Sequence, residues 1–457
     1  MTEQKDLELY DRSHQKLRTF SPIDPSHIRI YFCGPTVYDQ VHLGNLRAMF
    51  CADLLVRTLR AYYPKVTFVR NITDIDDKII IRAAENKEDI SALTQRMSEL
   101  FHQNTSALAI LPPDIEPRAT EHLPEMISII QTLLKKGHAY QADNQIFFNV
   151  QTFSTYGALS GRTLENELSG ARIEVSSSKK KPQDFILWKP SLENEPGWDS
   201  PFGRGRPGWH IECSAMSQKY LGDNFDIHGG GSDLLFPHHE NERAQSLCCF
   251  DNSKFAQYWV HSGMLTINGE KMSKSLGNFF TVQDALERAP GEALRLLFLM
   301  THYRSPLDFT WEKLSEAKKM MDRFYRALSL YEMDYNTNND DIPPMIESLR
   351  NDLNTADLIR NLHLLTDQIQ QQDKNSLSAA KRLYKTGHFV GLFQTSPQDW
   401  FQSGDDEEKK RIESLIQKRQ NAKKVRDFRT ADKIRDDLFS QGIILEDKAQ
   451  GTIWRKA

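Results

Sequence analysis

The chain has 457 residues, of which 39% are hydrophobic and 26% are charged, and its formal net charge is −4 at pH 7. This length predicts several domains rather than one core, and the acidic balance excludes a protein coated in basic surface, so nucleic-acid binding would need a local patch. The sequence shows neither a membrane-length apolar run nor a secretory pattern, which predicts a cytoplasmic protein without a membrane partner.

Residues 1–117 are predicted to form the first half of a nucleotide-binding domain. Ile28–Cys33 is an apolar, β-prone run, Leu43–Arg60 has apolar residues at helical spacing, and Val66–Asn71 is predicted to be a second strand. Strands that alternate with helices are typical of a Rossmann-like parallel sheet. Ligands of such sheets lie at the carboxyl ends of the strands, so the segments just after these two strands are predicted to border the site.

Residues 118–206 have a different pattern and are predicted to be a connective insertion that divides this domain. An amphipathic helix over Leu123–Lys136 is followed by a strand pair around Gln145–Val150. A polar run of serines and lysines, Ser176–Lys181, is expected to be an exposed loop.

Sheet patterns return over residues 207–275, the predicted second half of the nucleotide-binding domain, with strands at Phe225–His228 and Tyr258–Ile267. The rest of the chain is predicted to contain a stem or linker region, a helical bundle and a small C-terminal module, at residues 276–315, 316–399 and 400–457. Apolar residues at helical spacing predict four helices, at Glu292–Met300, Trp311–Leu330, Ile342–Leu365 and Ser376–Phe393. The expected fold class is therefore α/β: a Rossmann-like parallel-sheet domain split by an insertion, followed by an α-helical domain and a small α+β module.

The C-terminal module is predicted to combine a basic helix, Arg411–Leu438, with two short strands at Gly442–Leu445 and Thr452–Arg455. The helix collects eight lysines and arginines between Lys418 and Arg435, although the chain is acidic overall. This local charge favours contact with RNA phosphates. The alternative is a solvated helix face whose charges pair with nearby aspartates, namely Asp427, Asp432, Asp436 and Asp437.

Two short motifs carry groups suited to nucleotide chemistry. HLGN, His42–Asn45, follows the first predicted strand, and KMSKS, Lys271–Ser275, lies late in the domain between two glycines. A lone lysine-rich loop is most often solvated surface, but the two motifs in this order resemble those of the class I aminoacyl-tRNA synthetases. Two further blocks, GWHIECSAM (Gly208–Met216) and DIHGGGSDLLFPHHENE (Asp226–Glu242), narrow the resemblance to the cysteinyl-tRNA synthetase family, over nearly the whole chain.

The resemblance implies an ATP site around HLGN. His42 and Asn45 would stand at a helix N-terminus, where donors and the helix dipole favour a phosphate chain, and Gly44 has no Cβ to block the adenosine. The usual motif of the family ends in histidine. Asparagine keeps a donor but carries no charge, so His42 is expected to make the more important transition-state contact. Further ATP contacts are expected from Gly34, Gly230 and Asp233.

The lysines of KMSKS, Lys271 and Lys274, are expected to face the leaving group. Amino-acid activation attacks the α-phosphate of Mg-ATP and expels pyrophosphate, so negative charge grows where two ammonium groups could stabilise it. The attacking carboxylate belongs to the substrate. The protein therefore supplies position and charge, with His42, Asn45, Lys271 and Lys274 as the expected catalytic residues.

A metal site follows from the resemblance and not from spacing. His238 and Glu242 lie four apart after Pro237, which predicts one face of a helix, but such pairs are more often surface or core residues. In the family, zinc ligands match Cys33, Cys213, His238 and Glu242, which implies one zinc ion per chain. His239 is expected to face the nucleotide or to pack locally. Zinc would take the thiolate of cysteine in preference to the hydroxyl of serine, so no editing domain is needed.

Three residues match those that frame the substrate cysteine in this family: Thr73, Trp209 and His228. Trp209 could also be an ordinary core residue, and His228 a strand-end histidine with satisfied hydrogen bonds. The remaining cysteines, Cys51, Cys248 and Cys249, are assigned to packing, and none of the five cysteines indicates a disulfide framework.

The resemblance implies a cysteine–tRNA ligase, which forms cysteinyl-adenylate from cysteine and ATP and transfers the cysteinyl group to tRNA(Cys), acting as a monomer. Residues 400–457 would bind the anticodon, with Trp454 and Arg455 near unstacked bases. One alternative is the related ligase that joins activated cysteine to an amino sugar, but that enzyme should lack the basic C-terminal module. Another is a non-catalytic tRNA-binding paralogue, which the intact lysines of KMSKS and the four metal ligands argue against.

Overall fold

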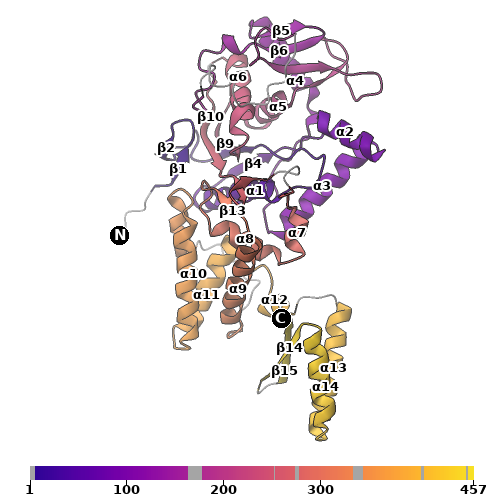
Figure 1. Cartoon of the computed structure of the whole chain (residues 1–457). Coiled ribbons are helices and arrows are strands. Elements are labelled where there is room, and N and C mark those ends of the chain that lie inside the picture. The colour runs from indigo at the N-terminus through magenta and orange to yellow at the C-terminus, as the bar shows by residue number, and fades with distance from the viewer. Residues whose placement is uncertain are drawn as a thin grey trace. The chain divides into compact units, whose positions relative to one another are not determined.

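The computed structural model describes residues 6–162, 178–251, 253–272, 277–332, 343–402, 406–448 and 451–456. The chain divides into two compact units (Figure 1). The first comprises Met1–Lys319, Ile342–Asn361 and Phe389–Leu392, and the second comprises Met320–Asp341, Leu362–His388 and Phe393–Ala457. Within the described segments, none of the helices has the length and apolar character that crossing a membrane requires.

A four-stranded parallel sheet forms the centre of the first unit, in the order β10-β9-β3-β4. The strands are β3 (Ile28–Phe32), β4 (Val66–Arg70), β9 (Asn224–Gly231) and β10 (Phe255–Ser262). Helix α1, Leu43–Tyr62, crosses from β3 to β4 and is largely buried. Most residues of these strands are buried, as a parallel sheet covered on both faces requires. The predicted Rossmann-like domain is confirmed.

The register of β3 and β9 brings two distant segments together at the carboxyl edge of this sheet. Tyr31 pairs with His228, and Phe32 pairs with Gly229. Cys33, just beyond β3, donates its N–H to the Gly229 carbonyl at 3.1 Å. The first and second halves of the domain therefore share one edge.

Residues 118–206, predicted as an insertion, carry an antiparallel sheet of their own between β4 and β9. Helices α2 (Asp77–Asn86) and α3 (Ile90–Ala107) precede the predicted insertion, and α4 (Leu123–Lys135) is its first α-helix. The antiparallel sheet has the order β5-β6-β7-β8, with bounds Ala139–Ala142, Gln145–Phe148, Phe185–Pro190 and Gly205–Pro207. Helix α5 (Trp209–Leu221) then leads back into β9, and α6 (Glu240–Cys249) connects β9 to β10. In the polar run predicted as a loop, Lys180 and Lys181 are exposed, whereas residues 163–177 lie outside the described segments.

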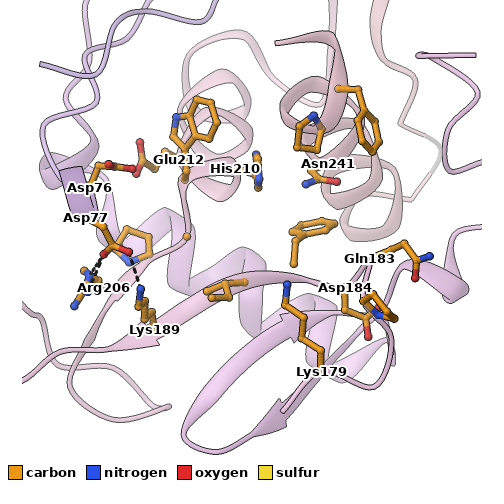
Figure 2. Close-up of a pocket in the computed structure, with 18 of the residues that line it drawn as sticks. Asp76, Asp77, Lys179, Gln183, Asp184, Lys189, Arg206, His210, Glu212 and Asn241 are labelled. Atoms are coloured by element: carbon orange, nitrogen blue, oxygen red, sulfur yellow. Dashed lines mark hydrogen bonds and ion pairs between the residues drawn. The ribbon is translucent and has the colours of Figure 1, made fainter. Parts of the chain in front are cut away.

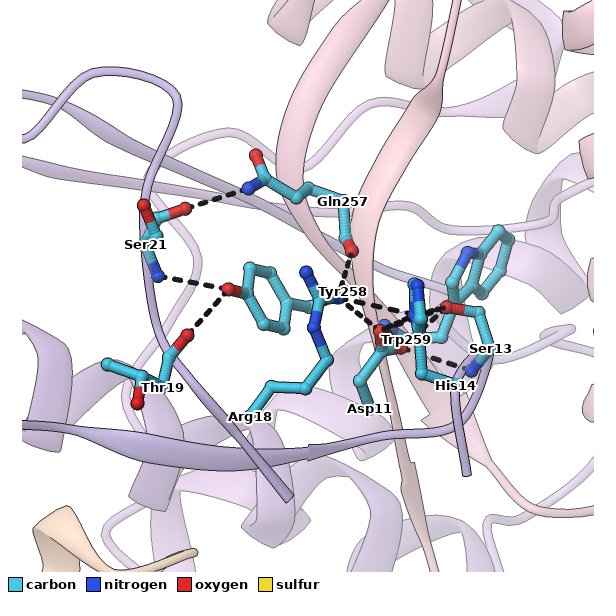
Figure 3. A network of polar contacts seen from close by, with 9 residues as sticks. All are labelled: Asp11, Ser13, His14, Arg18, Thr19, Ser21, Gln257, Tyr258 and Trp259. Atoms are coloured by element: carbon cyan, nitrogen blue, oxygen red, sulfur yellow. Dashed lines mark hydrogen bonds and ion pairs between the residues drawn. The ribbon is translucent and has the colours of Figure 1, made fainter. Parts of the chain in front are cut away.

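An N-terminal hairpin that the sequence did not reveal is attached to β10, the strand at one end of the sheet order. It consists of β1 (Glu8–Asp11) and β2 (Lys16–Thr19). Figure 3 shows the buried Asp11 at the centre of a polar network in which it accepts the Trp259 backbone N–H at 3.1 Å and the Arg18 guanidinium at 2.5 Å. The Arg12 N–H also donates to the Trp259 carbonyl at 2.9 Å. The hairpin therefore satisfies main-chain groups that an edge strand leaves unpaired.

The sheet pattern predicted over Tyr258–Ile267 corresponds to two strands and not one, because the chain breaks at Gly263 and Met264. Beyond the break, β11 (Leu265–Ile267) forms a second small sheet with β12 (Glu270–Lys271) and β13 (Leu307–Asp308). A Cβ at position 263 would lie 2.3 Å from the Ser305 carbonyl oxygen, so glycine permits this close backbone crossing.

The helix predicted over Ile342–Leu365 is also wrong. A 3-10 segment, Pro344–Arg350, is separated from α10 (Thr355–Gln370) by a break in which Asp352 and Leu353 have positive φ angles of 51° and 55°. The Asp352 carboxylate accepts bonds from the Tyr10 N–H at 2.9 Å, the Tyr303 hydroxyl at 2.7 Å and Arg304 at 2.6 Å. Tertiary bonds to a buried carboxylate therefore override the local helical pattern. The other helices here are α7 (Val282–Leu286), α8 (Gly291–Leu299), α9 (Trp311–Leu328), α11 (Ser376–Phe389) and α12 (Pro397–Phe401).

The C-terminal module has two helices where the sequence predicts one. Helix α13 (Asp406–Lys424) ends before Arg426, whose φ is 60°, and Asp427 caps α14 (Phe428–Ser440) through the Thr430 N–H at 3.1 Å. An antiparallel pair follows, β14 (Ile443–Lys448) and β15 (Gly451–Lys456), which confirms the predicted α+β module. Its core consists of Ile412, Ile416, Leu438, Ile443 and Trp454.

Trp454 is 3% exposed. Its predicted position beside unstacked bases is wrong, because the side chain fills this core.

Candidate functional site

Four buried side chains converge at the carboxyl ends of β3 and β9. Cys33 follows β3, Cys213 lies on α5, and His238 and Glu242 flank the start of α6; their ligand atoms all lie within 4.8 Å of one another. The two Sγ atoms are 3.7 Å apart, and Cys33 Sγ is 3.3 Å from Glu242 Oε1. His238 Nε2 is 2.9 Å from the same carboxylate oxygen. The structure therefore brings all four predicted metal ligands together.

These separations fit one tetrahedral ion. Bonds of about 2.0–2.3 Å from zinc to nitrogen, oxygen and sulfur place neighbouring ligand atoms about 3.3–3.8 Å apart. The sulfur–sulfur and sulfur–oxygen distances fall in this range, and only the His238–Glu242 distance is shorter. Two thiols, an imidazole and a carboxylate are also a donor set suited to a soft or borderline cation. The cluster can therefore hold a metal ion.

Three surrounding side chains hold these ligands in position. His210 Nδ1 lies 2.9 Å from His238 Nδ1, and His228 Nε2 lies 2.8 Å from Glu242 Oε2, the oxygen that faces away from Cys33 and His238. The Trp209 ring stacks on the His238 imidazole with ring centres 4.1 Å apart. Such contacts fix ligand orientation in metal sites. Sequence reasoning missed His210, although it lies three residues before Cys213 on the same helix.

A second set of four residues shares two members with the first. The ligand atoms of Cys33, His228, His239 and Glu242 also lie within 4.8 Å of one another. This set has one thiol instead of two. Its His228 bonds to Glu242 Oε2, the oxygen that faces away from Cys33 and His238, and a residue in that position orients a metal ligand and does not bind the ion itself. His239 Nδ1 lies 2.8 Å from His261 Nε2 in a fully buried position. The set that contains both thiols is the better metal site.

The acidic and basic groups of the cluster perturb one another strongly. Burial raises the pKa of the Cys33 thiol well above its ordinary value, and Cys213 and Glu242 raise it further. Burial opposes the ionised form of Glu242, but His228 and His238 hold the pKa of this carboxyl well below its usual range. Burial lowers the pKa of His238, yet Glu242 and Cys213 outweigh it and raise the pKa to about 10. This crowding of acidic groups is what a bound divalent cation would relieve.

A cavity of about 270 Å³ borders the cluster through Cys33 and Trp209. It is lined by residues from the end of β3, the start of α1, the end of β9 and the connection after β10. Predicted ATP-site residues that line it are Gly34, His42, Gly44, Asn45 and Asp233. Five of the predicted nucleotide contacts thus line one cavity beside the predicted metal ligands. Gly230 is not among the described residues that line it, and Lys274 lies outside the described residues.

The HLGN motif forms the first turn of α1. His42 is the N-cap, its Nδ1 accepts the Asn45 N–H at 3.2 Å, and the Asn45 side-chain oxygen accepts the His42 N–H at 3.4 Å. In a neutral His42 ring this leaves Nε2 as the protonated, donating nitrogen. The reciprocal cap orients Asn45 so that its amide nitrogen remains as a donor. Asn45 is therefore a helix-capping residue at the cavity as well as a candidate ligand contact.

The predicted glycines serve close packing inside the protein. A Cβ at Gly34 would lie 1.6 Å from the Asn71 carbonyl oxygen, and one at Gly44 would lie 3.0 Å from the His42 ring. A Cβ at Gly230 would lie 3.0 Å from Leu234. Gly34 is therefore required by the fold itself, whereas a side chain at Gly44 or Gly230 would make a tight contact that the neighbouring side chain must yield to.

Among the residues predicted to frame the substrate cysteine, Thr73 contacts a buried carboxyl that sequence reasoning missed. The Thr73 hydroxyl donates to Glu212 Oε2 at 2.9 Å and accepts a bond from the Asn71 amide at 3.3 Å. Burial raises the pKa of Glu212 well above its ordinary value, and the neighbouring Cys213 adds to the effect. Trp209 is 37% exposed and lines the cavity, whereas His228 is completely buried. The sequence signal that could have identified Glu212 was its position in the GWHIECSAM block, next to Cys213.

The second motif is described only in part. The backbone of Lys271 ends strand β12, and Met272 lines the cavity. Lys274 lies outside the described residues. The structure therefore brings the start of this motif to the nucleotide cavity, and the expected contacts of both lysines stay predictions.

The chain is similar to known proteins in both sequence and fold. Residues 19–319 match the family model described as the tRNA synthetases class I (C) catalytic domain. The chain belongs to this family. A cysteine–tRNA ligase of Gluconobacter oxydans is 57% identical over 452 residues, covering 99% of this chain and 98% of that protein. A cysteine–tRNA ligase of Acidiphilium cryptum is 51% identical over 453 residues, covering 99% of each.

Solved structures show the same fold at low sequence identity. Methionyl-tRNA synthetase of Mycobacterium tuberculosis in complex with methionyl-adenylate has a TM-score of 0.55 and 14% identity, covering 80% of this chain and 89% of that chain. At this identity the likeness establishes the fold alone, and it supports the Rossmann-like arrangement of this class I synthetase.

This class I synthetase has a second cavity, of about 250 Å³, which also borders Trp209 (Figure 2). Figure 2 shows Asp77 holding Lys189 and Arg206 of the insertion at 2.6 Å and 2.8 Å. Glu212 and His210 face the same space from α5. These ion pairs connect the insertion to the N-terminus of α2. They border the same cavity as His210 and Trp209, which contact His238.

Proposed function

We propose that the chain is a cysteine–tRNA ligase that activates cysteine with Mg-ATP and transfers it to tRNA(Cys), acting as a cytoplasmic monomer. The observation that carries the proposal is the buried set Cys33, Cys213, His238 and Glu242, whose member Cys33 lines the same cavity as the HLGN turn. Relatives named cysteine–tRNA ligase, at 57% and 51% identity over nearly the full length, support the same activity.

Cysteine selection is proposed to depend on zinc held by these four residues. Zinc would supply a Lewis-acidic centre that binds the substrate thiolate as a further ligand, and serine offers only a harder hydroxyl. Trp209, stacked on His238, and Thr73, whose hydroxyl is fixed by Glu212, would bound the remainder of the amino acid.

Activation is proposed to depend on position and charge. The substrate carboxylate attacks the α-phosphate, while His42, through Nε2, and the Asn45 amide donate to the phosphate chain at the N-terminus of α1. Lys271 and Lys274 would neutralise the departing pyrophosphate. Asp233, exposed at the rim of the cavity, would accept bonds from the ribose hydroxyls.

The C-terminal module is proposed to bind the anticodon with other aromatic groups than the sequence predicts. Phe428, at the start of α14, is 60% exposed, and Phe439 is 68% exposed. Several lysines and arginines of α13 and α14 lie beside them in the chain, whereas Arg419 and Lys423 are bonded to Asp447 at 2.8 Å and 2.7 Å. Exposed rings near lysines and arginines suit splayed bases.

The two alternatives are a cysteine–amino sugar ligase and a non-catalytic paralogue. The described C-terminal module disfavours the first, and the assembled metal set and the capped HLGN turn disfavour the second.

One experiment separates these functions. Purified protein is assayed for cysteine-dependent ATP–pyrophosphate exchange, then for acylation of tRNA(Cys) and of a candidate amino sugar. Exchange with charging of tRNA supports the proposal. Exchange with transfer only to the sugar would favour the sugar ligase, and absence of exchange in zinc-loaded protein would favour the paralogue.

A further inference from the structure

Arg47 is a buried arginine on α1 that bonds to four main-chain oxygens. It is 2% exposed and lies two residues after Asn45, on the helix whose first turn is the HLGN motif. Burial lowers its pKa to about 10, so the guanidinium still carries its charge at neutral pH. In the described part of the chain its hydrogen-bond partners are four carbonyl oxygens and no carboxylate.

Two of these carbonyls belong to the wall of the nucleotide cavity. Arg47 Nη1 donates to the Gly263 oxygen at 3.0 Å and to the Met264 oxygen at 2.8 Å. Gly263 and Met264 form the break between β10 and β11, and both line the cavity that the HLGN turn also lines. Strand β11 pairs with β12, which ends at Lys271.

The other two carbonyls belong to the segment that crosses behind this wall. Arg47 Nη2 donates to the Ser305 oxygen at 2.5 Å and to the His302 oxygen at 3.3 Å. The Gly263 N–H donates to the Tyr303 oxygen at 2.7 Å, and a Cβ at position 263 would lie 2.3 Å from the Ser305 oxygen. The guanidinium therefore occupies a junction of three chain segments, namely α1, the β10–β11 connection and residues 302–305.

We infer that Arg47 is a positioning residue for adenylate formation, which sets the distance between the HLGN turn and the β10–β11 connection on either side of ATP. This inference rests on the proposed function. Only a planar, forked cation can bind four carbonyls on two segments at once, whereas lysine offers a single ammonium point. Misplacement by about 1 Å can cost on the order of a hundredfold in rate, so the junction should matter to activation although Arg47 need not touch a ligand.

A purely structural role is the competing explanation, and the same helix offers a matched control. Arg57 also bonds to two main-chain oxygens, those of Ala109 and Phe389, at 2.7 Å and 3.0 Å, and it pairs with Asp53. It contacts neither the β10–β11 connection nor the 302–305 segment among its described hydrogen bonds. Loss of either arginine should destabilise α1, but only loss of Arg47 should disturb the ATP step.

The test compares Arg47→Met, Arg47→Lys and Arg57→Met as full-length, zinc-analysed proteins, well below their melting temperatures. Cysteine-dependent pyrophosphate exchange gives kcat and separate KM values for ATP and cysteine. For Arg47→Met, kcat/KM for ATP should fall on the order of a hundredfold, while the cysteine KM and the zinc content stay within about twofold of the parent. Arg47→Lys should fold and show a smaller loss in the same direction.

Each outcome decides one question. Inactivity of the parent protein would overturn the proposed function and not the inference alone. If the parent is active, two results would overturn the positioning role. One is an unchanged kcat/KM for ATP in Arg47→Lys, and the other is an equal reduction of kcat/KM for ATP in the Arg47 and Arg57 variants. If Arg47→Met does not fold, Arg47→Lys against Arg57→Met still decides it.

Discussion

The Sγ atoms of Cys33 and Cys213 lie 3.7 Å apart although 180 residues separate them in the chain. Cys33 follows β3, the first strand of the parallel sheet, and Cys213 lies on α5, the helix that leads from the insertion back into that sheet. Two thiols at this distance, with a carboxylate oxygen 3.3 Å from one of them, crowd acidic groups that a bound cation would hold in their ionised forms.

Cys213→Ser is expected to remove most of the zinc from the purified protein, because it takes away one of two thiolates. Metal analysis after gel filtration measures the effect, and Cys248→Ser, another buried cysteine outside the cluster, is the matched control. Full zinc content in Cys213→Ser would show that the zinc ion is bound elsewhere.

Zinc binding is expected to release about two protons near pH 7.5, because ligands must be deprotonated. The pKa values of Cys33 and His238 are raised in the metal-free protein, the second to about 10, so both hold protons at this pH. The pKa of Cys213 is lowered to about 6: burial opposes the thiolate, but a hydrogen bond from Cys33 and the nearby His238 outweigh it. Zinc affinity should therefore rise with pH through the neutral range.

Calorimetry in buffers of different ionisation enthalpy measures this proton release. No dependence of the observed heat on the buffer would contradict it.

Lys274→Ala is expected to slow adenylate formation by about a hundredfold to a thousandfold, since the ammonium group acts on charge that develops in the transition state. Cysteine affinity should hardly change. Pre-steady-state activation kinetics would measure both, with the exposed Lys254→Ala as a control. A normal activation rate with weakened cysteine binding would assign this lysine to the amino acid instead.

Phe428→Ala is expected to raise the KM for tRNA with little effect on pyrophosphate exchange or melting temperature, because the ring is 60% exposed. Stacking on one base is worth about 1–3 kcal/mol, or roughly a fivefold to hundredfold change. Trp454→Ala should instead destabilise the module by about 3–5 kcal/mol, as the side chain lies in its core.

Removal of the module should follow Gln402 rather than residue 400, because Trp400 is buried and its indole N–H donates to Asp322 at 2.8 Å. The truncated protein should keep pyrophosphate exchange and lose efficient charging of tRNA. Equal charging by both proteins would mean that the module does not read the anticodon.

Asp53→Asn is expected to destabilise the first unit at neutral pH by about 3–5 kcal/mol, since it breaks a buried charge pair. Burial opposes the charge of Asp53, but Arg295 and Arg57 hold the pKa of its carboxyl below the ordinary value. The folded pKa is thus below the unfolded one, so the stabilisation is present above about pH 4 and is lost as pH falls through the folded pKa.

Thermal unfolding of both proteins from pH 7 to pH 3 measures this effect. Their difference in melting temperature should narrow below about pH 4, while Asp251→Asn, in an exposed pair with Lys136, should change little at any pH. A difference that stays constant across the range would exclude the charge of Asp53 as its cause.

The sequence by itself determined the elements whose pattern is local. The apolar runs of β3 and β4, the helical spacing of α1 and the strand pair at the C-terminus were all predictable, because side-chain periodicity reports which face of an element is buried. The motifs also identified the chemistry, since HLGN and the ligand types of the metal set are legible as residues. Their assignment to one site came from resemblance, not from spacing.

Only the tertiary structure decided where distant groups meet and where local patterns fail. Asp352 breaks a helical pattern because its carboxylate bonds to Tyr10, Tyr303 and Arg304, all remote in sequence. Trp454 is buried because residues of α13 and α14 pack around it. The contacts of Arg47, His210 and Glu212 were equally invisible. Periodicity cannot encode a partner that lies tens or hundreds of residues away, because that contact exists only after the sheet and its helices have packed.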